Sequence, residues 1–205
     1  METNNNNYHH GDLKSALIDA AERLIKEKGI ASLSLRNIAS EVGVSHMAPY
    51  SHFKNKSELF QAVAASGFTE LGKRMMKIKQ DLADPKELIL LYGVEYITFA
   101  SHNPQLYKLM LSQTHPGKHL ENSPDSHIPN ESDLSLHEAS KQPYVLLRDG
   151  FARFQQDQHK LKIQAQGAWA MVHGIASLVI EGHIVLDEKT SIKTFLATAT
   201  IGMTT

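Results

Sequence analysis

The sequence contains no cysteine among its 205 residues. This absence excludes disulfide bonds, thiolate metal sites and cysteine nucleophiles, and it is compatible with a reducing cytoplasm. The hydrophobic fraction of 41% is ordinary for a folded protein. The length is sufficient for one small module and one larger core.

Long apolar runs are also missing. The longest nearly apolar run, residues 167–180, contains His173 and is shorter than the about 20 residues that a helix needs to cross a bilayer. The N-terminal residues METNNNNYHHGD are polar and lack the apolar centre of a signal peptide. We therefore expect a soluble, cytoplasmic protein with no membrane partner.

An excess of basic charge is absent as well. The formal net charge is −1, and residues 1–66 carry seven Lys or Arg against seven Asp or Glu. Averaged in this way, the charge gives no sign of nucleic-acid binding. Four basic side chains nevertheless flank the second helix of one short segment: Lys14, Arg36, Lys54 and Lys56. Phosphate neutralisation there would be local and modest, so high affinity would require a dimer.

That segment, residues 34–53, predicts a helix-turn-helix. Ser34 can cap a first helix, and Gly43 can form the turn because positive φ costs glycine little. Ser45 can cap a second helix that runs through residues 46–52, with Pro49 tolerated in its first turn. Apolar residues at helical spacing anchor the unit: Leu35, Ile38, Ala39, Val42 and Phe53. Such a unit places its second helix in the DNA major groove.

Helical periodicity continues along the chain and strand alternation is missing, so the predicted fold class is all-α. We expect a flexible arm over residues 1–11, an N-terminal three-helix helix-turn-helix domain over 12–54, and a helical C-terminal domain over 55–205. The predicted helices cover residues 12–28 (with Asp12 as N-cap and Gly29 as C-cap), 34–42, 45–52, 55–80, 84–102, 105–112, 133–158, 162–182 and 189–203. Residues 114–130 are expected to form a loop, and Pro143 is the expected position of any kink.

The run at 167–180 carries apolar residues on every side of its helix. A globular helix of this kind must be buried on both faces. One face can pack within its own domain, and the simplest partner for the other is a second copy of the chain. We therefore predict a homodimer. The candidate interface residues are Trp169, Gly174, Ile175 and Leu178.

Residues 34–60 (SLRNIASEVGVSHMAPYSHFKNKSELF) resemble the DNA-binding signature of the TetR family of bacterial transcription regulators. The resemblance rests on the GVS turn, the Tyr-x-His-Phe group at 50–53 and the Asn-Lys pair at 55–56. The opening YHHGDLKSALIDAA and the later AWAMVHG resemble a subgroup named for a Trp-His-Gly motif, which here is Trp169, His173 and Gly174. Asn37 and Pro49 stand where many members carry an acidic residue and Leu, respectively.

The resemblance implies a homodimer that binds a roughly palindromic double-stranded DNA operator. A small-molecule effector would enter the helical C-terminal domain, which serves ligand binding and dimerisation, and release the DNA. Repression is the usual outcome, and no cofactor is expected. A helical enzyme is the weaker reading because no nucleophile–base pair or phosphate loop is recognisable. A helix-turn-helix fold that acts as a protein-interaction module without DNA binding remains an alternative, because residues 1–66 have no net charge.

The candidate DNA contacts are Ser34, Arg36, Ser45, His46, Met47, Tyr50, Ser51, His52 and Lys56. By resemblance, Tyr50 and His52 bind phosphate, although His52 could equally pack internally. Met47 could contact a thymine methyl group, and His46 a base or a phosphate. Each groove residue could equally be a surface residue that makes no contact. Lys56 at a helix N-terminus combines a positive charge with nearby N–H donors.

The candidate pocket residues are Tyr96, Phe99, His102, Met110, Tyr144, Leu147, Phe151, Trp169 and His173, with an ordinary bundle core as the alternative. Twelve histidines also raise the question of a metal site. His115 and His119 are four residues apart, but a Pro-Gly pair between them prevents a helix and no carboxylate or cysteine framework accompanies them. We therefore predict no metal site.

Overall fold

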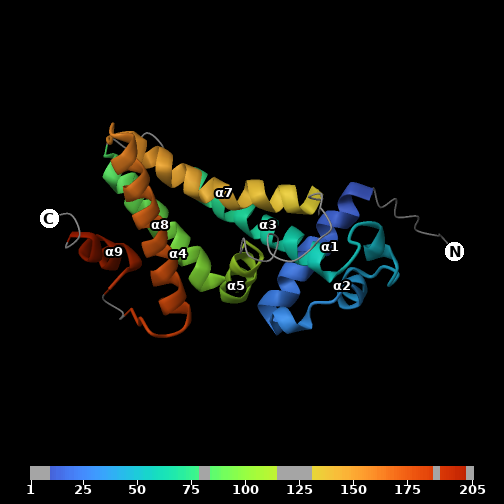
Figure 1. The fold of residues 1–205 in the computed structure, drawn as a ribbon. Helices are drawn as coiled ribbons and strands as arrows, with labels where there is room; N and C mark the ends of the chain where they lie inside the picture. The colour runs from blue at the N-terminus through green and yellow to red at the C-terminus, as the bar shows by residue number, and fades with distance from the viewer. Residues whose placement is uncertain (1–9, 79–83, 115–130, 187–189, 202–205) are drawn as a thin grey trace, which may run out of the picture.

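The computed structural model describes residues 10–78, 84–114, 131–186 and 190–201. Over these residues every regular element is a helix and no strand is present, which confirms the all-α fold class. Figure 1 shows an elongated molecule with α1 and α2 at one end and α4, α8 and α9 at the other. Helices α3 and α7 lie side by side between the two ends (Figure 1).

The head consists of α1 (His10–Lys28), the short 3-10 helix η1 (Ile30–Ser32), α2 (Leu35–Val42) and a second 3-10 helix η2 (Ala48–Ser51). Helix α1 begins at His10, so the predicted arm over 1–11 is too long and Asp12 is not the N-cap; residues 1–9 lie outside the described part. Gly29, at φ 78°, ends α1 as predicted, and its N–H donates to the Ile25 carbonyl at 2.9 Å.

The body consists of longer helices. They are α3 (Lys56–Met76), α4 (Pro85–His102), α5 (Pro104–Gln113), α7 (Glu131–Ala152), α8 (Gln158–Ile180) and α9 (Ile192–Ile201). The predicted loop at 114–130 falls almost wholly on residues outside the described part, as does the expected end of the last helix at 202–203. Two other expected ends are wrong: α3 ends at Met76 rather than at 80, and α9 begins at Ile192 rather than at 189.

Helix α3 contributes to two separate apolar cores. Leu59 and Val63 in its first half are fully buried against α1 and α2, together with Phe53. Phe68 and Leu71 in its second half are buried against α4 and α7. One continuous helix therefore shares its length between the head and the body, and the proposed boundary at 54/55 cuts the chain where the cores still interlock.

The structure corrects the boundary between α7 and α8. The sequence predicts one helix to residue 158 and the next from 162, whereas α7 ends at Ala152 and α8 begins at Gln158. The Asp157 carboxylate accepts hydrogen bonds from the backbone N–H groups of His159 (2.9 Å) and Lys160 (3.1 Å). This N-cap begins α8 four residues earlier than apolar periodicity indicates. Pro143 lies inside α7.

Candidate functional site

The first helix of the helix-turn-helix forms as the sequence predicts. The Ser34 side chain accepts a hydrogen bond from the Asn37 N–H at 3.1 Å. Gly43 ends α2 at φ 77°, ψ 28°, in the left-handed region that glycine adopts at low cost. The Asn37 side chain donates to the Ser32 carbonyl at 2.8 Å. It thereby ties η1 to α2.

The second element is not the predicted α-helix over 45–52. Residues 46–47 form a turn and Ala48–Ser51 form a 3-10 helix. The Ala48 N–H donates to the Ser45 carbonyl, and the Tyr50 N–H donates to the Met47 carbonyl. Pro49 explains the difference, because it has no N–H for an α-helical bond to Ser45 and it disfavours helical geometry at the preceding residue.

This tight turn nevertheless exposes the predicted reading residues. Met47 is 72% exposed and Tyr50 is 51% exposed, so both side chains are accessible to a partner. The remaining exposed candidates in this turn are Ser45, His46 and Ser51. The His46 ring lies 3.3 Å from the Ser40 hydroxyl, which connects the turn to α2.

The basic side chains around the turn lie in different settings. Arg36 and Lys56 are exposed, and the Lys56 ammonium group lies 5.0 Å from the centroid of the Phe60 ring. The Asn55 side chain caps α3 by accepting from the Glu58 N–H at 3.0 Å. His52 is half-buried, with its ring 6.5 Å from that of the buried Phe53. The internal-packing alternative for His52 is therefore the better description of its position.

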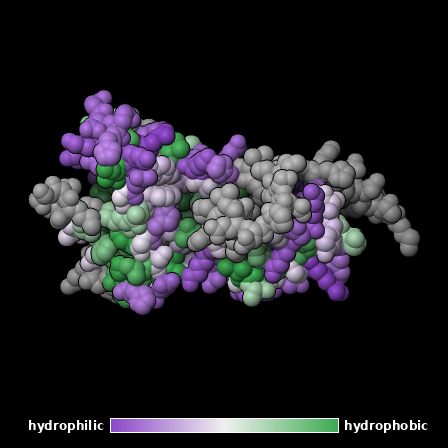
Figure 2. All heavy atoms as spheres, in the orientation of Figure 1, coloured by the Kyte–Doolittle hydropathy of each residue, from purple (hydrophilic) through white to green (hydrophobic). Residues whose placement is uncertain are grey.

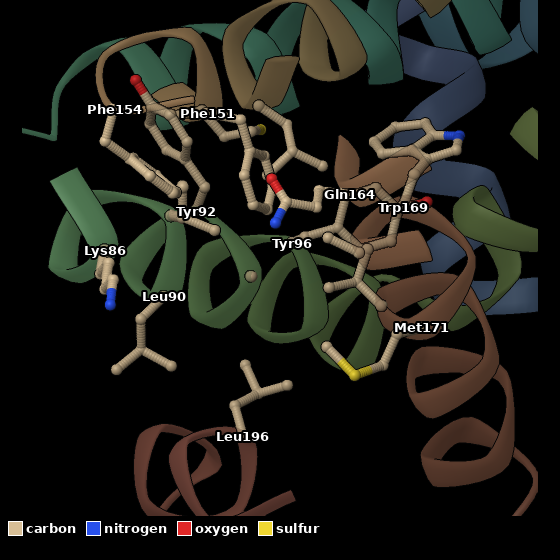
Figure 3. Close-up of a pocket in the computed structure, with 16 residues that line it drawn as sticks. Lys86, Leu90, Tyr92, Tyr96, Phe151, Phe154, Gln164, Trp169, Met171 and Leu196 are labelled. Atoms are coloured by element: carbon tan, nitrogen blue, oxygen red, sulfur yellow. The ribbon is translucent and has the colours of Figure 1, made fainter. Parts of the chain in front are cut away.

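The body contains a cavity of about 440 Å³ between α4, α7, α8 and α9. This volume lies within the usual range for small-molecule sites. Figure 3 shows aromatic, aliphatic and sulfur-containing side chains around it. The lining residues that sequence reasoning missed include Met75, Lys86, Leu90, Tyr92, Phe154, Gln164, Ala168 and Met171. For those on α4 and α8, recurrence at helical spacing is the signal that could have found them; Met75 lies on α3 and Phe154 follows α7.

Of the nine predicted pocket residues, Tyr96, Leu147, Phe151 and Trp169 line this cavity. The other five lie elsewhere. Phe99 and Met110 are buried in the core, and Tyr144 packs edge-on against Trp169. His173 lies behind the cavity wall, where it contacts the lining residue Tyr96. His102 lines a separate surface hollow beside α1, together with Glu22 and Arg23.

A buried polar chain supports the inner wall of the cavity. The His173 Nδ1 atom lies 2.8 Å from the Trp169 carbonyl oxygen, so Nδ1 carries the proton and donates it. His173 Nε2 then accepts from the Tyr96 hydroxyl at 2.9 Å. Burial lowers the pKa of His173, an effect that the Trp169 carbonyl partly opposes. Burial and the neighbouring Tyr107 raise the pKa of Tyr96, which keeps its proton.

Helix α8 has a packed face and an open face. Its buried residues are Leu161, Ala165, Val172 and Ala176. On the opposite side Ile163 is 56% and Leu178 is 41% exposed, and a Cβ atom added at Gly167 or Gly174 would meet nothing within 4 Å. Figure 2 shows hydrophobic side chains gathered at the end of the molecule where α8 and α9 lie.

The four predicted interface residues lie on different sides of α8. Trp169 packs inward against Tyr96, and Ile175 packs against the body core, whereas Gly174 and Leu178 lie on the open face.

By length and composition α8 also qualifies as a membrane span, which is weak evidence because one of its faces packs in the core. Among the described residues, no group of three or more metal-ligating side chains could hold an ion; His115 and His119 lie outside that part.

Two known protein families match this chain. The family of bacterial regulatory proteins of the tetR type matches residues 17–63, and the tetracyclin repressor-like C-terminal domain matches residues 89–199. The chain belongs to the TetR family. The second match covers every residue that lines the cavity except Met75 and Lys86, so the two matches fall on the head and on the body of this TetR-family protein.

Individual relatives agree with the family assignment. The chain is 39% identical over 77 residues to the HTH-type nicotine-responsive transcriptional repressor HdnoR of Paenarthrobacter nicotinovorans. That alignment spans 38% of this chain and 40% of the relative. A protein of unknown function from Rhodococcus sp. RHA1 shares 25% identity at a TM-score of 0.72, with 96% of each chain covered.

Two further solved structures share the fold. A TetR transcriptional regulator from Rhodococcus sp. RHA1 is 16% identical at a TM-score of 0.63, covering 96% of this chain and 98% of that one. FadR from Bacillus subtilis, solved in complex with stearoyl-CoA, is 17% identical at a TM-score of 0.61, covering 90% of this chain and 94% of that one.

Proposed function

We propose that this TetR-family protein is a transcription repressor that binds operator DNA as a homodimer and leaves it when a small molecule enters the body cavity. The observation that carries the proposal is the exposed turn of the head, with Met47 72% and Tyr50 51% exposed beside Arg36 and Lys56. Exposure of this kind is costly unless the surface has a partner.

In this proposal the residues of the turn divide into two roles. Ser45, His46, Met47 and Ser51 face the base edges, and Met47 meets a thymine methyl group. Arg36, Tyr50 and Lys56 contact phosphates, which positions the head without reading sequence. Ser34 combines its observed cap with a phosphate contact at the helix N-terminus. His52, which is half-buried beside Phe53, stabilises the turn.

The open face of α8 is the proposed dimer surface. Exposed apolar residues at both ends and two glycines between them would allow a second α8 to approach closely. A two-fold dimer presents two heads, as a palindromic operator requires. It would also bury the apolar face that makes α8 resemble a membrane span.

The cavity is the proposed effector site. It lies between α4 and α8, and α4 also packs against α3, the helix shared by head and body. A ligand that separates α4 from α8 would therefore act on the helix that carries the head. The name of the relative HdnoR, a nicotine-responsive repressor, supports both repression and ligand response in this proposal. No cofactor and no catalysis are part of it.

The test begins with selection of duplexes from a random pool by the full chain. Compounds that quench Trp169, which is the single tryptophan of the chain and lines the cavity, are then screened for release of the selected duplex. Ala168→Phe fills the cavity and should retain DNA binding while losing release. Absence of any selected duplex would overturn the proposal, as would unchanged release from the filled variant.

A further inference from the structure

The cavity has an unequal distribution of charge. Among the described residues that line it, Lys86 is the one with a formal charge, and no carboxylate is present. Gln164 adds an amide, and the remaining lining residues are apolar, aromatic or glycine. A ligand held there meets a positive group and nothing that balances a positive charge of its own.

Lys86 lies at one end of the cavity. Lys86, Leu90, Gly93 and Tyr96 follow one face of α4, and ten residues of helix span about 15 Å. In Figure 3, Lys86 and Leu90 lie on one side of the cavity, and Trp169 and Met171 lie on the other. The cavity is therefore elongated, with a charged end and an apolar end.

Near the apolar end, the Tyr96 hydroxyl and both ring nitrogens of His173 are already engaged. The Tyr96 hydroxyl donates to His173 Nε2 at 2.9 Å and lies 3.3 Å from the Tyr107 hydroxyl. The His173 Nδ1 atom is committed to the Trp169 carbonyl. A ligand reaching this end meets ring faces and aliphatic carbon, and a polar group placed there would lose its hydration without compensation.

The Lys86 charge, in contrast, is uncompensated within the described residues. No carboxylate among them lies within ion-pair distance of its ammonium group. The neighbouring Glu87 is paired with Lys193. The Asp84 side chain accepts from the Lys86 backbone N–H at 2.9 Å as the α4 N-cap. Lys86 is exposed, so its ammonium group remains hydrated until a ligand arrives.

We propose that the effector is an apolar monocarboxylate, with its carboxylate beside Lys86 and its hydrocarbon body along α4 toward Trp169. This inference rests on the proposed function and names the ligand class of the same cavity. Organic cations are disfavoured because the lining offers them a like charge. Coenzyme A thioesters are disfavoured because a single lysine cannot balance their several phosphate charges.

The test uses two matched ligand series, measured by quenching of Trp169 in the full chain. Nonanoate, 1-nonanol and nonylamine differ only in the polar group, and so do 4-phenylbutyrate, 4-phenylbutanol and 4-phenylbutylamine. The acid should bind about fivefold more tightly than the alcohol, and the amine most weakly. The two series distinguish an aliphatic from an aromatic acid.

Variants assign the preference to Lys86. Lys86→Gln should reduce the affinity for the acid to that for the alcohol and leave the alcohol unchanged. Lys73→Gln, at an exposed lysine of α3 outside the cavity, should change neither. An alcohol or amine that binds as well as the acid would overturn the inference, and so would an unchanged acid preference in Lys86→Gln.

Failure of this inference is distinguishable from failure of the proposed function. If neutral or cationic compounds release the selected duplex and acids do not, the ligand class is wrong and the repressor assignment stands. If no duplex is selected at all, the proposed function itself fails, whatever the cavity binds.

Discussion

At the scale of single residues, the head depends on side chains whose roles follow from their immediate neighbours. Ser34 caps α2, Gly43 adopts positive φ, and Pro49 turns the second element into a 3-10 helix. The first two follow from sequence because a cap and a left-handed turn are local properties. Pro49 is harder to interpret, because its tolerance in a first turn and its missing N–H act in opposite directions.

Removal of the exposed groups of the turn should weaken DNA binding without affecting assembly. Tyr50→Ala and Lys56→Ala should each reduce affinity for a selected duplex about tenfold, since each loses a hydrogen bond to a charged phosphate. Lys56→Ala should also reduce the salt dependence. Anisotropy titrations measure the affinity, with Lys73→Ala as the control. Loss of the dimer in either variant would contradict the assignment to DNA.

The buried His173 makes stability depend on pH in a defined direction. Its folded pKa lies below the unfolded value of about 6.5, so between the two the unfolded chain binds more protons. The contribution of neutral His173 to the free energy of unfolding is fully present above pH 6.5. It is lost as the pH falls through that value toward the folded pKa. Thermal melting at pH 7.5 and 5.5 should show this loss, and His173→Gln should reduce it. Glu22, whose pKa is raised by burial, is common to both proteins and cancels from the comparison. An equal loss of melting temperature in the unsubstituted protein and in His173→Gln would show that His173 is not its cause.

The pocket residues show where sequence reasoning reaches its limit. Tyr96 and Trp169 line the cavity, but Phe99 and Met110 have the same apolar character and lie in the core. The difference is set by which helix faces which neighbour, a tertiary property. Lys86 was missed because a lysine near a helix N-terminus looks like an ordinary solvated charge.

At the scale of elements, helix boundaries follow the caps more closely than the apolar stripes. Asn55 begins α3 and Asp84 begins α4, both as predicted, because each side chain accepts from the first turn of its helix. Asp157 begins α8 by the same mechanism. Apolar periodicity does not predict this cap, because the residues that directly follow Asp157 are polar. Periodicity reports which face is buried, whereas caps report where the helix starts.

The cap of α2 should be measurable as stability. Ser34→Ala removes the acceptor for the Asn37 N–H and should cost about 1 kcal/mol in free energy of unfolding. Glu41→Ala, at an exposed residue in the last turn of the same helix, should cost less than about 0.5 kcal/mol. Urea unfolding of the two variants provides the comparison. Equal losses would mean that the Ser34 cap contributes nothing specific.

At the scale of the whole molecule, two cores share one long helix, and an apolar face remains open. Head and body are joined through α3, whose two halves are buried in different clusters. The sequence predicts a partner-covered helix at 167–180 with Trp169 at the interface, whereas the Trp169 ring packs against Tyr96 within its own chain. Apolar residues all round a helix cannot by themselves tell its inner side from its outer side.

A charge on the open face should separate the proposed dimer. Leu178→Asp places a carboxylate within the proposed apolar contact and should give a monomer with a folded helical spectrum. Met76→Asp, at a residue of similar exposure on α3 (45% against 41%), should leave the dimer intact. Sedimentation velocity distinguishes the two states. A dimeric Leu178→Asp would exclude this face of α8 as the interface.

If the two heads of one dimer read DNA together, titration of a selected duplex with the full chain at increasing salt should show it. We expect two protomers per duplex, clear preference over a scrambled duplex, and affinity that falls steeply as salt rises. Binding that shows no preference over the scrambled duplex at any salt concentration would contradict it.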